Sequence, residues 1–244
     1  MSTLPPVSIY TPGSQPDLFQ HPALFLSASV PYERPGLTDP KAIARNRHYL
    51  ASAKPALIRE AVAHLCRFSF QRGLNLIFGA HPLISPMVLD AARRFGSSAG
   101  RKQVVIFQSA FFETDLIPRE TLELANSGCG ELLWTQKQAA KGKPDRDESL
   151  KHMRKVMVQS AHLVGSIFIG GMEGVEEESR LFAQHQRGKP CYAIGSTGSA
   201  AKDLLSRSPA DFRGNNQSIH ASELMTLESY PLVMKHLFAD LGIP

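Results

Sequence analysis

Apolar positions along this chain gather in short runs of four to seven residues, separated by longer stretches in which polar and apolar residues mix. The runs lack the strict alternation of a strand with one exposed face, so they indicate strands that are buried on both faces. Six such strands are predicted, at residues 23–27, 74–78, 103–107, 131–135, 163–169 and 191–194.

The stretches between these runs carry the start and stop signals of helices. Segment 52–72 has Pro55 near its start and Gly73 just past its end. Ser85 followed by Pro86 predicts an N-cap and a first-turn proline. Two more helices are predicted, one from about residue 174 to Gly188 and a C-terminal one at 224–241 that Pro231 interrupts.

Strand and helix therefore alternate from residue 23 to the C-terminus. Parallel neighbours need a crossover, which is usually a helix, so this order predicts an α/β fold. We expect a Rossmann-like, three-layer, doubly wound arrangement with a mostly parallel sheet, in a single domain over residues 23–244. Residues 1–22 contain five prolines and no periodic pattern, and we expect them to form an extended N-terminal arm.

The composition agrees with an ordinary globular domain. Of 244 residues, 43% are hydrophobic and 20% are charged, which argues against disorder or a coiled coil. Cys66, Cys129 and Cys191 stand far apart, so neither a disulfide framework nor a zinc site is expected, and no metal or other cofactor is predicted. No apolar run reaches the roughly 18 residues of a membrane span, and the first basic residue is Arg34, so we expect a cytoplasmic protein without membrane contact.

The charge balance favours anionic partners. Lys and Arg number 27 against 22 acids, so the net charge is +5 and the isoelectric point is near 9.2. The densest basic segment, 137–146, is interleaved with acids and is expected to be a solvated loop. With one Trp and no stretch of interleaved basic and aromatic residues, nucleic acid is not the expected partner.

The loops after five of the predicted strands point to a ligand. In an open parallel sheet, ligands bind beyond the carboxyl ends of the strands. These loops are small, polar or rich in glycine, which lets the backbone approach a ligand and presents amides and hydroxyls to it. Together they favour a nucleotide-sized polar ligand. The candidate binding residues are Ser27, Ser29, Gly79, His81, Gln108, Ser109, Gly170, Gly171, Glu173, Gly174, Ser196, Thr197 and Gly198.

Several common catalytic motifs are absent from the sequence. No GxGxxG follows the first strand and no GxxxxGK[ST] occurs, which disfavours an ordinary dinucleotide-linked dehydrogenase and a P-loop NTPase. Neither GxSxG nor HExxH is present, so the commonest serine hydrolases and zinc proteases are excluded as well.

Arg154 stands out because of where a helix would place it. In segment 148–162, Leu150, Met153 and Met157 form an apolar stripe, and Arg154 lies at the margin of that stripe. A guanidinium keeps its charge when it is partly buried, so this position calls for an anionic partner.

The following helix presents an acid to the same side. Glu178 shares a face with Val175 and Phe182, which places its carboxyl group at or near the buried side. Glu176 lies on the outer face, where Arg180 is its expected partner. Acids at a helix N-terminus also stabilise the macrodipole, but that role does not require an inward-facing carboxylate.

At these residues the sequence resembles a known family. The MRKVM helix at 153–157 and the GGMEGVEEE segment at 170–178 are similar to the RK-containing helix and the PGGxGTxxE loop of the LOG-type phosphoribohydrolases. These enzymes belong to the SLOG superfamily, with the DNA-processing protein DprA and the ADP-ribose-type sensor domains of TRPM channels. The GAHP and QSAFF segments add a closer similarity to stand-alone and TIR-associated SLOG proteins of bacterial conflict systems.

The resemblance implies roles for specific side chains. Arg154 corresponds to the arginine that holds phosphate or ribose, and Glu178 to the acid that faces the ribose and assists cleavage in the hydrolases. Because this loop has one residue more than the family pattern, Glu177 stays open as the equivalent acid. Val175 replaces the threonine of the pattern and removes a phosphate donor, so the phosphates are expected nearer residues 195–199 instead.

Two functions follow from this resemblance. In the first, the protein binds a nucleotide or an NAD-derived ligand of the ADP-ribose type and acts as a sensor in a bacterial stress or antiphage system, as a homo-oligomer and with a TIR or other effector as a further partner. In the second, it is a LOG-like N-glycoside hydrolase in which the same carboxylate stabilises an oxocarbenium-like transition state.

Overall fold

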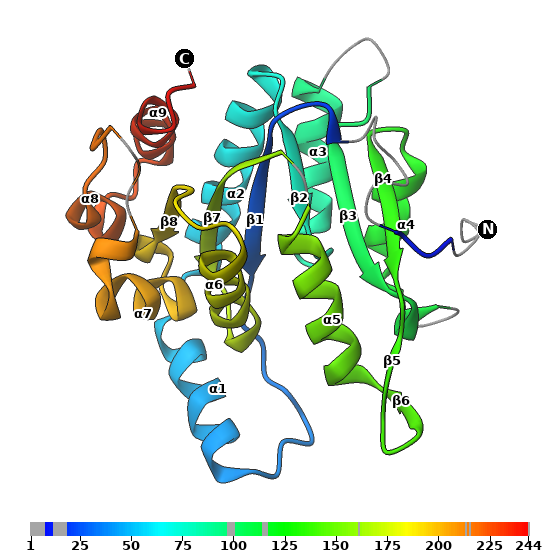
Figure 1. Ribbon diagram of the computed structural model, residues 1–244. Coiled ribbons are helices and arrows are strands. Elements are labelled where there is room, and N and C mark those ends of the chain that lie inside the picture. The colour runs from blue at the N-terminus through cyan, green and yellow to red at the C-terminus, as the bar shows by residue number, and fades with distance from the viewer. Residues whose placement is uncertain are drawn as a thin grey trace.

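Six parallel strands form the central sheet of the computed structural model (Figure 1). The structure describes residues 8–11, 19–96, 101–113, 117–160, 162–212, 214 and 216–243. The strands are β1 (Ala23–Ser29), β2 (Asn75–Phe78), β3 (Val104–Ser109), β4 (Gly130–Thr135), β7 (Leu163–Gly170) and β8 (Cys191–Ile194). Their order is β4-β3-β2-β1-β7-β8, and every neighbouring pair is parallel. All six strands predicted from the apolar runs are present.

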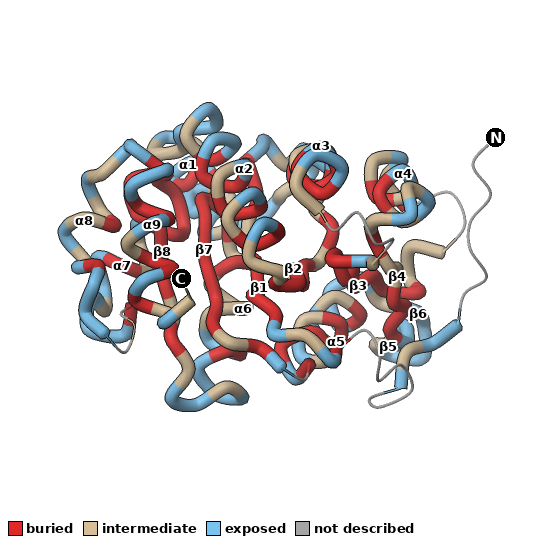
Figure 2. The backbone as a smooth tube through the Cα atoms, turned by 90° about the horizontal axis from the view of Figure 1, so that it is seen from above, coloured by how far each residue is buried: buried red, intermediate tan, exposed pale blue. Residues whose placement is uncertain are grey.

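Helices cover both faces of the sheet. They are α1 (Pro40–Ser52), α2 (Pro55–Gln71), α3 (Ser85–Phe95), α4 (Arg119–Asn126), α5 (Arg146–Val158), α6 (Glu173–His185), α7 (Ser199–Arg207), α8 (Ala221–Thr226) and α9 (Tyr230–Asp240), with short 3-10 turns η2 (Ala110–Phe112), η3 (Gly195–Thr197) and η4 (Pro209–Asp211). Helices α2, α3 and α4 lie on one face, and α5 and α6 lie on the other (Figure 2). The predicted three-layer α/β fold in a single domain is therefore confirmed.

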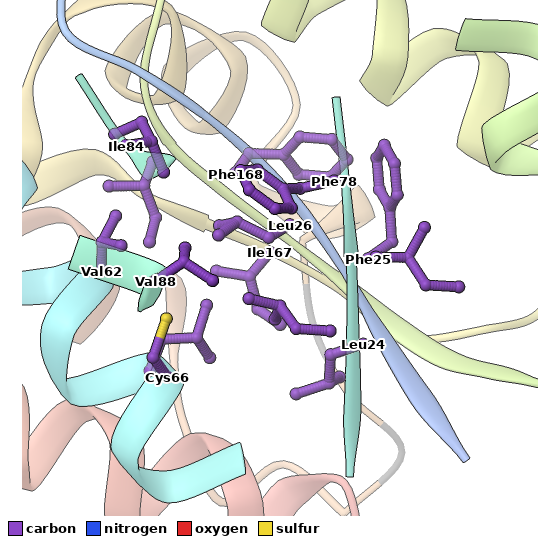
Figure 3. Packing of buried hydrophobic residues seen from close by; sticks show 14 of the residues in the cluster. Leu24, Phe25, Leu26, Val62, Cys66, Phe78, Ile84, Val88, Ile167 and Phe168 are labelled. Atoms are coloured by element: carbon purple, nitrogen blue, oxygen red, sulfur yellow. The ribbon is translucent and has the colours of Figure 1, made fainter. Parts of the chain in front are cut away.

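The core fills the space between the sheet and these helices. Phe25 on β1 stacks on Phe182 of α6, with ring centroids 5.8 Å apart. Leu24 and Leu26 point to the opposite face, as successive residues of a strand do, where Val62 and Cys66 of α2 are also buried (Figure 3). Because β1 is buried on both faces, its sequence is apolar without alternation.

The strand order reverses between β1 and β7. From β1 the chain builds outward through β2, β3 and β4, and then returns to place β7 and β8 on the other side of β1. At this switch point the end of β1 lies beside the end of β7, with Ser29 opposite Gly170. Loops that leave the sheet in opposite directions open a crevice there, which is the usual ligand position in this architecture.

Some helix boundaries differ from those predicted. The helix expected at residues 52–72 begins at Pro55, because Ser52 is the last residue of the preceding helix, α1. Ser85 is the first residue of α3 and Ile84 is its N-cap, so the predicted capping role of Ser85 is wrong. Pro231 lies in the first turn of α9, where a proline is tolerated, and therefore separates α8 from α9.

The apolar pattern gives no sign of α1 or of a small hairpin formed by β5 (Gln138–Ala140) and β6 (Lys143–Asp145). Only Asn46 and Tyr49 of α1 are buried, so this helix carries no apolar stripe. The basic segment 137–146, expected to be a loop, forms the hairpin and the first residue of α5. None of the helices in the described ranges is both long and apolar enough to span a bilayer.

Part of the predicted N-terminal arm lies along the outer strand β4. Ile9 forms a parallel bridge with Trp134, and the backbone N–H of Tyr10 donates to the carbonyl of Trp134 at 2.7 Å. The ring of Tyr10 packs edge-on against Phe107, with centroids 5.5 Å apart. Residues 1–7 and 12–18 of the arm lie outside the described part of the chain.

Candidate functional site

A cavity of about 780 Å³ opens at the carboxyl ends of the strands. Its walls are the loops that follow β1, β2, β3 and β7, together with α5 and the start of α6. A volume of this size lies within the range of small-molecule sites. The residues predicted from the sequence that line this cavity are Ser29, Gly79, His81, Gln108, Arg154, Glu173, Gly174, Glu177 and Glu178.

Four polar side chains form a cluster at the cavity, and three of them, Arg154, Glu177 and Glu178, line it. Nη1 of Arg154 donates to Oε2 of Glu177 at 2.5 Å, and Nε of Arg154 lies 3.4 Å from Oε1 of Glu178. Ser27 on β1 donates from its hydroxyl to the other oxygen of Glu178 at 2.5 Å. Arg154 thus contacts both acids that the sequence left open, and Ser27 joins Glu178 to the sheet.

The local sequence explains how these groups meet. Met153 and Met157 are buried, and they turn the face of α5 that carries Arg154 toward α6. Gly174 leaves room for the guanidinium at the first turn of α6, because a methyl group there would lie 2.9 Å from Nη2 of Arg154. The side chain of Glu178 is 13% exposed, on the inner face of α6 as predicted.

Opposing effects act on the pKa of Glu178. Burial raises the pKa of its carboxyl group above the ordinary value of 4.5, and the nearby Glu177 adds to this effect. Arg154 and the hydrogen bond from Ser27 act in the opposite direction and favour the carboxylate. A carboxyl group with a raised pKa in a cavity is suited to exchange a proton with a ligand.

The basic side chains that line the cavity are all paired with acids of the same chain. Arg34 contacts Glu173 at 3.0 Å between Nη2 and Oε1, in the loop after β1. On α5, Arg146 lies 3.2 Å from Asp147 and Lys151 lies 3.7 Å from Glu148. A phosphate group that enters would compete with these carboxylates or bind N–H groups that the pairs leave free.

Aromatic and apolar side chains form another part of the cavity wall. The ring of Tyr32 lies 6.3 Å from the ring of His81, between centroids, and Leu83 and Phe112 line the same space. Burial lowers the pKa of His81 to about 4, so its imidazole is neutral at physiological pH.

The double glycine at the end of β7 serves the backbone and does not line the cavity. Gly170 and Gly171 have φ of +58° and +91°, a region that disfavours side chains. A Cβ at either position would collide with Ile58 or Val175. The N–H of Gly171 donates to the carbonyl of Ser29 at 2.8 Å, so it is not directed at a ligand.

The loop before α7 also lies away from the cavity, in contrast to the expectation that phosphates bind at residues 195–199. Thr197 donates to the carbonyl of Ile194 and accepts from the N–H of Gly170. The N–H of Ser199 donates to the hydroxyl of Ser52 at 3.1 Å. The end of α1 therefore occupies the position at this helix N-terminus where a phosphate would have to lie.

The remaining expected residues are also engaged within the protein. Ser196 shares a hydrogen bond with the hydroxyl of Tyr230, and a Cβ at Gly198 would collide with the backbone of Ser52. Ser109 accepts from the N–H of Phe111 and so caps the 3-10 turn η2. These three residues and the double glycine shape the loops around the cavity without lining it.

Glu176 differs from its predicted role. Its carboxylate contacts Arg45 of α1 and Arg207 of α7, and not Arg180. Arg180 donates instead to Gln184 on its own helix. The ion pairs of Glu176 join three helices on the side of α6 that faces away from Arg154.

Tyr32, Arg34 and Phe112 are among the cavity residues that the sequence did not predict to bind a ligand. Tyr32 and Arg34 follow β1 in the segment between Pro31 and Pro35, and Phe112 lies in η2. An aromatic and a basic residue between two prolines just after a strand is the signal that could have located the first two. Among the described residues, no group of three His, Cys, Asp or Glu side chains could hold a metal ion.

A family model described as the SLOG cluster3 family matches residues 48–225, which is more than half of the chain. The chain belongs to the SLOG cluster3 family. The match includes α5, β7 and α6, so the contacts of Arg154 with Glu177 and Glu178 lie within the SLOG region. No curated protein matches the chain.

Proposed function

We propose that this SLOG protein binds a nucleotide or an NAD-derived ligand of the ADP-ribose type in the cavity at the carboxyl edge of its sheet. The observation that carries the proposal is the contact of Arg154 with Glu178 at a cavity of suitable size. Ser27 donates a hydrogen bond to Glu178 and so holds its carboxyl group in place. Its place at the switch point of the sheet adds support, because nucleotides bind there in related architectures.

The side chains of Arg154 and Glu178 suit a ribose. The carboxylate of Glu178 can accept from ribose hydroxyl groups, while Arg154 supplies a positive charge beside it. Nε of Arg154 is buried and faces Oε1 of Glu178 at 3.4 Å, so a ligand oxygen would have to approach the outer nitrogens of the guanidinium. Phosphate groups would replace a carboxylate on Arg154 or on Arg34.

Titration calorimetry with ADP-ribose, NAD and AMP tests this proposal. We expect the wild type to bind at least one of them, and Arg154→Ala to weaken binding at least tenfold, because a hydrogen bond to a charged group contributes about 1.5–3 kcal/mol. Arg119→Ala, whose side chain is 85% exposed on α4, is the control and should bind like the wild type. If no ligand binds, or if Arg154→Ala binds normally, the proposal is wrong.

A second candidate function is N-glycoside hydrolysis. The observation that favours it is the buried Glu178, whose pKa is raised and which faces the cavity. Such an acid could stabilise an oxocarbenium-like ribose or protonate the departing base. Incubation of NAD, ADP-ribose and nucleoside monophosphates with the protein, followed by chromatography, would detect a released base. Glu178→Gln should abolish that release; no release by the wild type would exclude the hydrolase and leave binding intact.

The proposal extends to a sensing role in a bacterial stress or antiphage system. Its support is the family membership of the chain and the closer resemblance to TIR-associated SLOG proteins. The working unit would be a dimer or larger homo-oligomer with a TIR or other effector as its partner. Light scattering with and without ADP-ribose tests whether the ligand changes the oligomer. A neighbouring TIR gene would favour sensing, whereas purine-salvage genes would favour hydrolysis.

A further inference from the structure

The part of the cavity wall around His81, with Tyr32 and Leu83, suits a flat, uncharged group. Among the described residues, Ile9, Tyr32, Leu83 and Leu232 are the large hydrophobic side chains that are exposed, and two of these line the cavity. Exposed apolar side chains gathered at a concave site indicate a surface that a partner or ligand covers. Because Arg154 and Glu178 suit phosphate and ribose groups, the base of a nucleotide is the part that fits here.

His81 is fixed in the cavity wall by its own backbone. Its carbonyl oxygen accepts from the N–H groups of Ile84 and Ser85, both at 2.9 Å, at the start of α3. Ala80, just before it, has φ of +48°, which is uncommon for a residue with a side chain. The strained backbone is therefore held in place by the first turn of the helix, and the imidazole has a defined position.

The protonation of the ring follows from its contacts. The backbone N–H of Leu83 donates to Nδ1 of His81 at 3.3 Å, so Nδ1 carries no proton. A neutral imidazole has one ring proton, which therefore lies on Nε2. No described residue makes a hydrogen bond with Nε2, so a neutral donor is left for the ligand.

We infer that Nε2–H of His81 donates a hydrogen bond to a ring nitrogen of an adenine base, and so selects the base of the bound nucleotide. This inference rests on the proposed function. A neutral donor in apolar surroundings suits a neutral acceptor, whereas phosphate and ribose oxygens are matched by Arg154 and Glu178. The ring of Tyr32 beside His81 offers a surface on which the base stacks.

Analogues of AMP test the inference directly. The 1-deaza, 3-deaza and 7-deaza forms each replace one acceptor nitrogen of adenine with C–H. We expect one of the three to bind the wild type about 3- to 10-fold more weakly than AMP does, the range for one neutral hydrogen bond. In His81→Asn, that analogue and AMP should bind equally, because the donor is gone.

The asparagine variant is chosen to preserve the fold. Its side-chain oxygen can still accept from the N–H of Leu83, as in an Asx turn, but its side chain ends short of Nε2. His81→Gln, whose amide reaches closer to the position of Nε2, should recover part of the preference. Thermal unfolding of both variants checks that the protein is intact.

Failure of the inference and failure of the proposed function give different results. If the wild type binds AMP but all three analogues bind equally well, His81 does not recognise a ring nitrogen. The same conclusion follows if the difference between AMP and the weaker analogue persists in His81→Asn. If AMP, ADP-ribose and NAD all fail to bind the wild type, the proposed function itself is wrong, and the inference falls with it.

Discussion

The guanidinium of Arg154 lies against the backbone of Gly174, so closely that a methyl group on that glycine would be 2.9 Å from Nη2. This contact brings a positive charge to the N-terminus of α6, where the helix macrodipole disfavours cations. Glu177 and Glu178, in the next turn, offset that effect through their contacts with Arg154. The acids of α6 therefore position the arginine, and the glycine gives it room.

Gly174→Ala should weaken ligand binding without lowering the stability of the protein. Alanine favours a helix by up to about 1 kcal/mol over glycine, so we expect the free energy of unfolding to stay constant or rise slightly. Ligand binding should weaken at least tenfold, because the methyl group displaces the guanidinium. In an Arg154→Ala background the same change should leave the residual binding unaltered. Calorimetry and urea unfolding measure both quantities; normal binding by Gly174→Ala would show that the close contact is unimportant.

Glu178→Gln should change how stability depends on pH. The pKa of Glu178 is raised mainly by burial, so its contribution to folding is greatest below about pH 4.5 and is lost as the pH rises through the folded-state pKa. Glutamine does not ionise and can still accept from Ser27. The free energy of unfolding of the variant, relative to that of the wild type, should therefore increase from pH 4 to pH 8. Urea unfolding at both values tests this, with the exposed Glu148→Gln as a control; a relative gain at the lower pH would contradict it.

The central features of the fold could be predicted because they depend on local periodicity. A strand such as β3, buried on both faces, needs an unbroken apolar run, and its sequence shows one. The inward positions of Arg154 and Glu178 follow from the spacing of apolar residues on α5 and α6 in the same way. Periodicity indicates which face of a helix is buried, and two successive crossover helices bring these faces together.

The rest of the site depends on contacts between distant segments. Ser52 covers the N-terminus of α7, and nothing in the sequence near Ser199 indicates that this helix end is already occupied. The pairing of Arg34 with Glu173 joins residues 139 positions apart. The loops after the strands were all candidates, and only the three-dimensional structure shows which of them line the cavity.

His81 should make the protein less stable in mild acid. Its pKa is lowered to about 4 by burial, whereas an unfolded histidine titrates near 6.5. The unfolded state therefore binds a proton first, and folding stability is lost as the pH falls from about 6.5 to 4, by about 1–3 kcal/mol. His81→Asn should remove this part of the slope. Urea unfolding across that range would contradict the prediction if wild type and variant lost stability in parallel.

The N-terminal arm should protect the outer edge of β4. Ile9 and Tyr10 occupy the backbone groups of Trp134, and an uncovered edge strand is a template for pairing with another chain. Deletion of residues 1–11 should therefore raise the molecular mass measured by light scattering above that of the full chain. Tyr10→Ala removes the ring that packs on Phe107 but keeps the N–H group, so it should associate less than the deletion. Equal association would mean that the buried ring, and not the covered edge, prevents pairing.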